Sequence, residues 1–237
     1  MRSDFAIIEA MLVLMPPNET LLPAPGRGQY DRRLPRERRL AEQHERLLAA
    51  TALSVARDVS PSVASIVRRA GVGRNSFYEY FDDVRHAVGA AQAAVLRRVE
   101  QVLRDAESTA RTPVERWRAL ARAWLSFTED EPEAMLLVLA IDARASGAMS
   151  SGATVLQAAL VRSLETLRNA GVTSPPAGPE RVLAVAAVGE AFARALGRAR
   201  IAASGVPDER GERASSEAWE REELERSLVD TAVRLLR

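Results

Sequence analysis

The sequence of 237 residues contains no cysteine and no lysine. The absence of cysteine excludes disulfide bonds, thiolate catalysis and zinc sites built on cysteine, and it is compatible with a reducing cytoplasm. All 33 basic residues are therefore arginines, which, with the abundant alanine, we attribute to the codon bias of a GC-rich genome. The number of arginines is consequently weaker evidence for nucleic-acid binding than their position along the chain.

Long hydrophobic runs are also lacking. Residues 4–17, DFAIIEAMLVLMPP, are interrupted by Glu9, close on two prolines and are too short to span a bilayer. They have neither a basic n-region nor a small-residue cleavage site, which argues against a signal peptide. We expect this segment to form a short amphipathic helix that docks on the protein's own surface or on a dimer mate. We also expect the protein to have no membrane partner and to be located in the cytoplasm.

Catalytic patterns are absent from the sequence. It shows no metal-spaced histidine pair, no nucleophile elbow and no Walker loop, and the only glycine pair, Gly71-Val72-Gly73, follows no predicted strand. His44 has no carboxylate arranged with it for catalysis, so we expect a structural or surface role. The sequence therefore predicts a protein that is not an enzyme and that has no metal site and no cofactor.

The charge of the chain is unevenly distributed although its total is only +1. Residues 27–104 hold 15 arginines against 9 acidic residues, a net charge of +6, whereas residues 105–237 hold 17 against 20, a net charge of −3. A basic region attracts phosphate groups and makes binding fall steeply with salt. The first half of the chain is therefore the expected partner of a nucleic acid.

Residues 62–81, SVASIVRRAGVGRNSFYEYF, predict two short helices joined by a tight turn. Ser62 stands at the N-cap of the first helix, which has one apolar face at three- and four-residue spacing. Gly71 stands where the chain turns with little steric cost, and Gly73 is expected to let the next helix start close by. This pattern is typical of a helix-turn-helix that enters a DNA major groove.

The second helix begins at Arg74 and is expected to bury Phe77 and Phe81, which lie four residues apart, and to turn its other side chains outward. Arginine and asparagine make bidentate hydrogen bonds to guanine and adenine, and hydroxyl groups reach phosphates or base edges. An aromatic core strip with a hydrated edge is the alternative interpretation. The DNA contacts predicted in the motif are Ser62, Arg74, Asn75, Ser76, Tyr78 and Tyr80.

Upstream, residues 26–39, GRGQYDRRLPRERR, combine glycine and proline with six arginines. Such a segment suits a flexible arm that meets phosphates or the minor groove, and Arg36 and Arg38 join the predicted DNA contacts on this basis. A solvated run of charge is the alternative.

The segment AGVGRNSFYEYF, preceded by the helix ERLLAATALSVARDV at 45–59, resembles the DNA-binding domain of the TetR family of bacterial transcriptional regulators. The resemblance covers about residues 40–90 and rests on the combined helix spacing, A-G-V turn and aromatic tail. It implies a homodimeric, all-helical regulator in which three N-terminal helices hold double-stranded DNA. It also implies a variable C-terminal domain that binds a small ligand and dimerises.

The sequence departs from the family pattern at two places. Val59-Ser60-Pro61 stands where the family often has a glycine and a longer loop. Asp82-Asp83-Val84 stands where a lysine often begins the fourth helix, which removes one expected phosphate contact and adds two carboxylates. The operator contact of that lysine must then be weaker or come from another residue.

The whole chain predicts an all-α fold. We expect an N-terminal extension, partly flexible, at 1–35, a three-helix helix-turn-helix domain at 36–84, and a C-terminal helical ligand-binding and dimerisation domain at 85–237. In the last domain, helices are expected at about 83–105, 113–128, 132–141, 153–170, 180–203 and from 217 to the C-terminus. Thr112-Pro113-Val114-Glu115 predicts a capping box with proline at the first helical position.

Large apolar residues in this domain predict a pocket for a hydrophobic effector, although an ordinary core is the alternative. The candidates are Trp117, Trp124, Phe127, Met135, Leu139 and Phe192. Two further seams predict a dimeric four-helix bundle, unless they are core within one chain. They are Ala184, Ala187, Val188, Ala191, Ala195 and Leu196, and Leu224, Leu228, Val229, Ala232, Val233 and Leu236.

The predicted function is a ligand-responsive transcriptional regulator, a dimeric repressor that a small hydrophobic effector releases from a palindromic operator. Repression rather than activation is implied by the resemblance alone. The alternatives are a DNA-binding dimer without small-molecule sensing, which no ligand would release from DNA, and a helical interaction module, which would show no salt-sensitive DNA binding.

Overall fold

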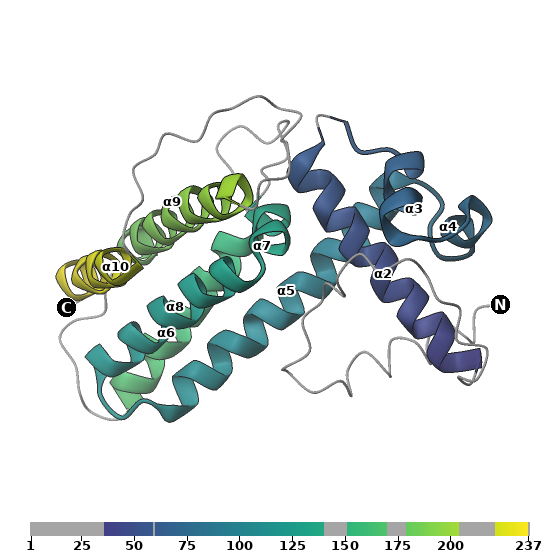
Figure 1. Ribbon diagram of the computed structural model, residues 1–237. Coiled ribbons are helices and arrows are strands. Elements are labelled where there is room, and N and C mark those ends of the chain that lie inside the picture. Colours follow the sequence, from purple (N-terminus) through teal and green to yellow (C-terminus); the bar gives the residue numbers. More distant parts are fainter. Residues whose placement is uncertain (1–35, 59, 140–150, 170–178, 204–220, 237) are drawn as a thin grey trace. The chain divides into compact units, whose positions relative to one another are not determined.

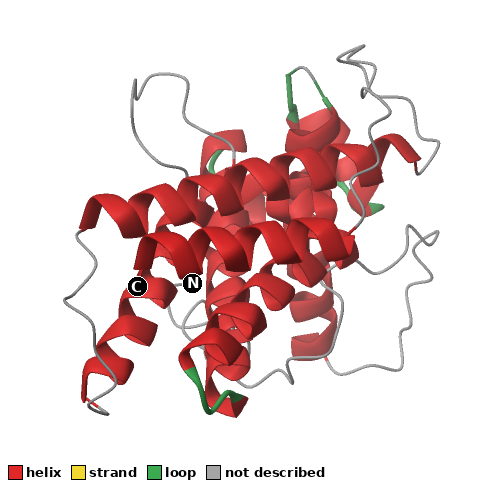
Figure 2. Cartoon of the chain, turned by 90° about the vertical axis from the view of Figure 1, so that its left-hand side faces the viewer, coloured by secondary structure: helices red, strands yellow, loops and turns green. Residues whose placement is uncertain are grey.

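The computed structural model describes residues 36–58, 60–139, 151–169, 179–203 and 221–236, and every regular element in these ranges is a helix (Figures 1 and 2). The all-α fold predicted from the sequence is confirmed for them. The helices are α2 (Arg36–Arg57), α3 (Val63–Ala70), α4 (Arg74–Tyr80), α5 (Val84–Thr109), α6 (Pro113–Asp130), α7 (Pro132–Leu139), α8 (Ser151–Asn169), α9 (Pro179–Ala203) and α10 (Arg221–Leu236).

The chain divides into two compact units, and the division falls inside α5, between Ala91 and Gln92. In unit 1, α2 packs against α3 and α3 against α4 (Figure 1). Leu47, Ile66 and Phe77 come from these three helices and are completely buried, so each helix contributes one large apolar side chain to a shared core. That core holds the short α3 and α4, which are too short to be stable alone.

In unit 2, α9 packs against four other helices, namely α6, α7, α8 and α10. Its sequence is rich in alanine, and the small side chains on its inner face let neighbouring helices approach closely. Gly189 is the tightest point, because a Cβ built there would lie 2.5 Å from Cδ2 of Leu156. The Nε1–H of Trp124 donates to the Gly189 carbonyl at 2.9 Å, which joins α6 to α9.

The α5 helix begins after Asp83, whose Oδ1 accepts the backbone N–H of His86 at 2.7 Å. Aspartate is among the preferred N-cap residues, because its side-chain oxygen accepts a backbone N–H of the first turn. The buried stripe of α5 has a strict four-residue spacing, Ala87, Ala91, Val95, Val99 and Leu103. Val88 and Val102 lie beside this stripe and are half-buried.

The predicted capping box at the start of α6 is confirmed. Thr112 Oγ1 accepts the backbone N–H of Glu115 at 3.2 Å, and the Glu115 carboxylate accepts the N–H groups of Arg111 and Thr112 at 3.0 Å. Those two backbone hydrogen bonds lower the pKa of Glu115 below its usual value. Four otherwise unpaired N–H groups make a helix start costly, and the box satisfies part of them.

The structure separates the two seams that the sequence offered for dimerisation. On α9, Ala184, Ala187, Ala191 and Ala195 are exposed, whereas Val188 is half-buried. Leu196 is buried, so its assignment to this seam is wrong. On α10, by contrast, Leu224, Leu228, Val229 and Ala232 are buried within the same chain, because this helix packs on α6 and α9. The prediction of an α10 dimer seam is therefore wrong for these residues, and the alternative, core within one chain, holds.

Some predictions concern residues outside the described ranges. These are the amphipathic segment 4–17 and the part of the arm at 26–35. The last part of the predicted arm lies within α2, since this helix begins at Arg36. Its first-turn residues Arg36 and Arg38 are exposed there.

Candidate nucleic-acid interface

The helix-turn-helix is built by two local devices at the ends of α3. Ser62 is its N-cap and forms a capping box with Ser65: Ser62 Oγ accepts the Ser65 N–H at 3.2 Å, and Ser65 Oγ accepts the Ser62 N–H at 3.1 Å. Gly71 ends the helix at φ 65° and ψ 36°, a left-handed conformation that a side chain disfavours. The predicted N-cap and turn are both confirmed.

The second glycine of the turn, Gly73, differs from Gly71 in its backbone conformation. Gly73 is the N-cap of α4 with an ordinary negative φ of −74°. The next helix does start close by, at Arg74, but a Cβ added at Gly73 would meet no atom within 4 Å, so this start does not require a glycine.

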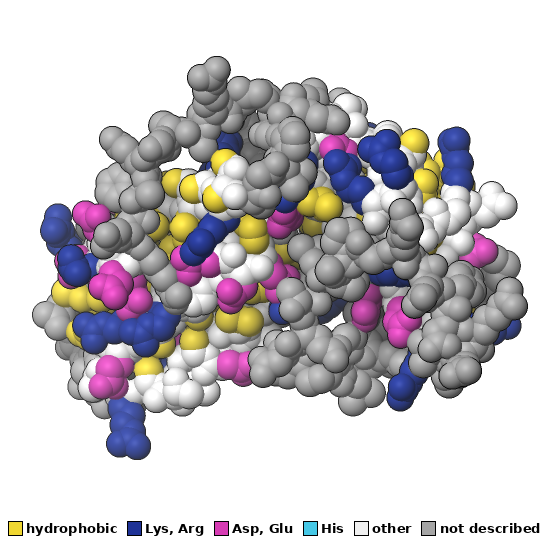
Figure 3. All heavy atoms as spheres, in the orientation of Figure 1, with side chains coloured by type: hydrophobic (Ala, Val, Ile, Leu, Met, Phe, Trp, Pro, Cys, Tyr) yellow, Lys and Arg dark blue, Asp and Glu magenta, His cyan; other side chains and the backbone are white. Residues whose placement is uncertain are grey.

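The α4 helix presents polar side chains on the side away from its core contact. Phe77 is completely buried, as the sequence predicts, while Arg74, Asn75 and Tyr78 are exposed and Ser76 is half-buried. Tyr78 is 49% exposed, an unusual state for a large aromatic side chain. In Figure 3 dark blue basic side chains project from the region of α3 and α4.

Arg74 and Tyr78 lie one turn apart and interact with each other. The guanidinium carbon of Arg74 lies 5.8 Å from the centre of the Tyr78 ring, and Arg74 Nη2 donates to the Tyr78 hydroxyl at 3.4 Å. A guanidinium group stacked on an aromatic ring keeps the N–H groups at its own edge free for further hydrogen bonds. The pair thus holds an arginine in an extended position on the exposed face of α4.

The expectation that Tyr80 faces outward is wrong. Its side chain is buried, its hydroxyl donates to the Leu40 carbonyl at 3.1 Å, and its ring lies 5.2 Å from that of His44. Since Tyr80 follows Phe77 by three residues, the helical period places both on the inner face. Tyr80 joins α4 to α2 and is removed from the set of predicted DNA contacts.

His44 belongs to the same aromatic cluster. It stacks on Phe81 with 5.6 Å between ring centres and is buried with no hydrogen-bond partner for Nδ1 in the described part of the chain. Burial lowers the pKa of His44 to about 4, so the imidazole is neutral at pH 7. The expected structural role is consistent with this position.

One arginine of α3, Arg69, has a structural role. Arg69 donates to both carboxylate oxygens of Asp58, at 2.5 and 2.6 Å, and to Ser54 Oγ at 2.9 Å. These hydrogen bonds from Arg69 hold the pKa of Asp58 below its usual value. Arg68, its neighbour, is exposed, as is Arg85 in the first turn of α5, and neither was among the predicted DNA contacts. Both could have been found from the sequence, because the helical repeat places them on the polar, solvent-facing side of their helices.

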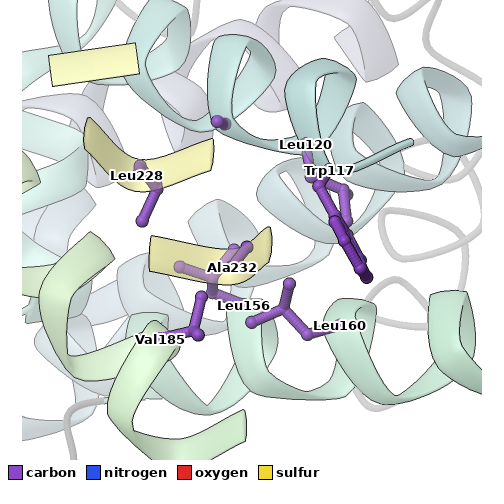
Figure 4. A pocket seen from close by; sticks show the side chains of 8 residues that line it. Trp117, Leu120, Leu156, Leu160, Val185, Leu228 and Ala232 are labelled. Atoms are coloured by element: carbon purple, nitrogen blue, oxygen red, sulfur yellow. The ribbon is translucent and has the colours of Figure 1, made fainter. Parts of the chain in front are cut away.

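Unit 2 contains a cavity of about 10 Å³ between α6, α8, α9 and α10 (Figure 4). It is lined by Trp117, Leu120, Ala121, Leu156, Leu160, Val185, Leu228 and Ala232. Of the six predicted pocket residues only Trp117 lines it. Trp124, Phe127, Met135 and Leu139 are buried core and Phe192 is half-buried, because strongly apolar residues on packed helices fill the interior first.

A second polar feature of unit 2 joins α5 to the corner between α6 and α7. Arg98 Nη2 lies 2.5 Å from Glu131 Oε1, and the guanidinium carbon lies 5.8 Å from the centre of the Phe127 ring. Glu131 Oε2 and Arg98 Nη1 have no hydrogen-bond partner among the described residues. Burial raises the pKa of Glu131 above its usual value despite the nearby cation.

Within the described ranges, no group of three or more histidine or acidic side chains gathers into a possible metal site. None of the helices there is both long and apolar enough to cross a bilayer.

Comparison with solved structures places this geometry among known folds. A TetR-like transcriptional regulator from Rhodococcus sp. RHA1 is similar with a TM-score of 0.59 at 17% identity, over 85% of this chain and 97% of that one. The chain has the fold of the TetR-like regulators. No protein-family model matches the sequence, and no curated protein matches it significantly.

Two further structures share this TetR-like fold. The fatty acid degradation regulator FadR from Bacillus halodurans is similar with a TM-score of 0.58 at 12% identity, over 83% of this chain and 98% of that one. A protein from Pseudomonas aeruginosa PAO1, provisionally described as a transcriptional regulator, has a TM-score of 0.57 at 22% identity, over 89% and 100%. The resemblance seen in the sequence around residues 40–90 thus extends at the level of fold over most of the chain.

Proposed function

We propose that this TetR-like protein is a DNA-binding transcriptional regulator and that α4 is its recognition helix. The observation that carries the proposal is the exposed face of α4, where Arg74, Asn75 and Tyr78 point away from a fully packed core. These side chains match the donors and apolar edges that read bases in a major groove. The TetR-like fold supports the proposal because the similar structures are described as transcriptional regulators.

The contacts divide by chemistry. Arg74 and Asn75 have the bidentate donors that distinguish guanine and adenine, and Tyr78 offers a ring to a thymine methyl or a hydroxyl to a phosphate. Ser62, Ser76, Arg36 and Arg38 are assigned to phosphates or base edges. Arg85 is the candidate to replace the lysine absent from the start of α5, because it is exposed in the first turn of that helix.

The proposed regulator acts as a homodimer on a palindromic operator, whose two half-sites lie about 34–36 Å apart along the DNA. The exposed alanines of α9 support a dimer face on this helix, since small side chains allow a second helix to approach closely. Leu183, 41% exposed on α9, and Val161, 39% exposed on α8, enlarge the apolar surface there.

Regulation by a small hydrophobic effector, with repression in its absence, completes the proposal. Unit 2 would bind the effector, and α5 would transmit the change, because this continuous helix has its N-terminal turns in unit 1 and the rest in unit 2. A shift of α5 alters the separation of two recognition helices in a dimer and thereby favours the free or the bound state.

Fluorescence-anisotropy titration with the intergenic DNA beside the protein's own gene tests the DNA-binding proposal. Arg74→Ala should weaken binding to the specific site about 10- to 100-fold, as the loss of a base-reading arginine does. Arg118→Ala is the matched control, since this exposed arginine lies on α6 in unit 2 and its loss changes the charge equally. Equal effects of the two substitutions would refute the assignment of α4.

A salt series separates specific from general binding. Tight, saturable binding to one site that competitor DNA does not remove supports the regulator, and Tyr78→Phe then reports the role of that hydroxyl. Binding that is lost with salt and has no sequence preference would instead favour an architectural DNA-binding protein.

A further inference from the structure

The cavity in unit 2 is lined by apolar side chains, one of which carries a polar group without a partner. Trp117 is 4% exposed, and its Nε1 has no hydrogen-bond partner in the part of the chain that the structure describes. An indole N–H can donate but not accept, and a buried donor without an acceptor costs free energy. A molecule in the cavity that brought an acceptor within reach of this N–H would therefore be stabilised.

A second tryptophan on the same helix has an indole N–H that does find a hydrogen-bond acceptor in this core. Trp124, seven residues further along α6, is completely buried, and its Nε1 donates to the Gly189 carbonyl at 2.9 Å. The fold thus supplies a backbone acceptor to the tryptophan that does not line the cavity. The tryptophan that lines the cavity receives none.

Ser163 adds a second unpartnered polar group on the same helix as two of the lining residues. It lies one turn after Leu160 on α8, is completely buried, and its Oγ has no hydrogen-bond partner among the described residues. Residues three apart share one face of a helix, so Ser163 continues the face that Leu160 presents to the cavity. Two hydrogen-bond donors therefore accompany this otherwise apolar lining.

The charges of this region argue for an uncharged ligand. None of the eight lining residues is ionisable at neutral pH. Arg162, next to Ser163, is paired with Glu107 at 3.3 Å, and Arg116, next to Trp117, donates to the Glu107 carbonyl at 3.4 Å. A charged ligand would lose its hydration without gaining a counterion from the lining, which is costly.

We propose that this cavity is the effector site and takes an uncharged, mainly apolar molecule with a carbonyl or similar acceptor that bonds to the Trp117 N–H. The inference rests on the proposed function as a ligand-responsive regulator and names the ligand class. A cavity of about 10 Å³ holds roughly one water molecule, so the ligand displaces side chains. Four lining residues are leucines, which Figure 4 shows around the cavity with Trp117, and leucines can change rotamer to make room.

Acetophenone and α-methylstyrene form a matched pair of probes, because they have nearly the same shape and differ in a C=O against a C=CH₂ group. Binding of each to the full-length protein without DNA is measured by headspace gas chromatography, which reports the free concentration of a volatile compound. The decisive quantity is the ratio of the dissociation constant of α-methylstyrene to that of acetophenone.

In Trp117→Phe this ratio should fall about tenfold, because the substitution removes the donor and keeps an aromatic ring. Trp124→Phe is the control and should leave the ratio within about twofold, although it removes the hydrogen bond to Gly189. Leu228→Ala enlarges the cavity and should tighten both probes while the ratio stays constant. Circular dichroism confirms that each variant is folded.

An unchanged ratio in Trp117→Phe would overturn the proposal and assign the N–H to a buried water. Binding of neither probe to the wild-type protein or to Leu228→Ala would overturn it as well. Operator binding measured on the same preparations keeps the two proposals separate. A protein that binds its operator but neither probe refutes only the effector site, and one that binds the probes but no DNA refutes the regulator.

Discussion

Two partly buried arginine–carboxylate pairs, Arg69–Asp58 in unit 1 and Arg98–Glu131 in unit 2, are built differently. In unit 1, Arg69 donates to both oxygens of Asp58 and also to Ser54, and the pKa of Asp58 is lowered. In unit 2, Arg98 meets one oxygen of Glu131, and the pKa of Glu131 is raised by burial. Hydrogen bonding prevails over desolvation in the first pair, and desolvation prevails in the second.

This difference separates a rigid part from an adjustable one. A fully hydrogen-bonded pair fixes α3 on α2, which suits the proposed role of this unit in presenting side chains to DNA in one geometry. The second pair leaves one polar atom unpartnered on each side among the described residues. Since a partly satisfied pair loses little when it rearranges, it suits the shift of α5 that we propose for the response to an effector.

The largest effect expected from this comparison follows from removing the arginines. Arg69→Met should lower the free energy of unfolding of unit 1 by about 3–5 kcal/mol, because it leaves Asp58 buried without a cation. Arg98→Met should cost unit 2 less, about 1–3 kcal/mol, because the raised pKa of Glu131 makes its neutral form easier to reach once the cation is gone. Amide hydrogen exchange measures the loss of stability in each unit separately. Equal losses would contradict the distinction between the pairs.

Acid should weaken unit 1 through His44. Its pKa is about 4 when folded and 6.5 when unfolded, so the unfolded state binds the proton more strongly. The stabilisation is complete above pH 6.5, declines as the pH falls, and is lost by about pH 4, a change of about 3 kcal/mol. Denaturant unfolding of wild type and His44→Phe measures it. The variant should lack this pH dependence, and a similar decline in both would exclude His44 as the cause.

The glycines extend the comparison, because unit 1 needs one for its backbone and unit 2 needs one for packing. Gly189→Ala should destabilise unit 2 by about 1–3 kcal/mol through collision with Leu156. Gly71→Ala should cost unit 1 about 1–2 kcal/mol through its positive φ. Thermal unfolding of each glycine variant combined with Leu156→Ala distinguishes the steric cause from the backbone cause. Leu156→Ala should reduce the penalty of Gly189→Ala and leave that of Gly71→Ala unchanged.

The smallest effect is expected for Glu131→Gln. At pH 7 it should change the stability of unit 2 by about 1 kcal/mol or less, because loss of the charge attraction is offset by easier burial. The raised pKa of Glu131 means that the folded state binds its proton first, so this group adds stability as the pH falls through its folded pKa towards 4.5. Urea titrations between pH 7 and 4.5 should show this gain in wild type and not in the variant.

Much of the fold was predictable from local signals. The caps at Ser62 and Thr112 and the turn at Gly71 all appear in the structure as expected. Caps and turns depend on a few neighbouring residues, so their chemistry can be read directly along the chain. The all-helical fold followed from the same periodicity.

The errors concern positions that local signals leave ambiguous. Tyr80 and the α10 seam were assigned to a surface from their type and spacing, and both are buried. Periodicity shows that a helix has an apolar face but not what covers that face. The hydrogen bond of Tyr80 to Leu40 joins residues forty positions apart, which spacing within one helix cannot reveal.

The sequence by itself determined the helices, their caps, the turn of the helix-turn-helix and the basic character of the first half of the chain. Only the tertiary structure decided which arginine is held by Asp58, which tryptophan receives an acceptor, and which of the two C-terminal seams stays exposed. The physical reason is range: helix propensity, capping and charge act between neighbours in sequence. Burial and hydrogen bonding of a side chain depend on partners that only packing brings together.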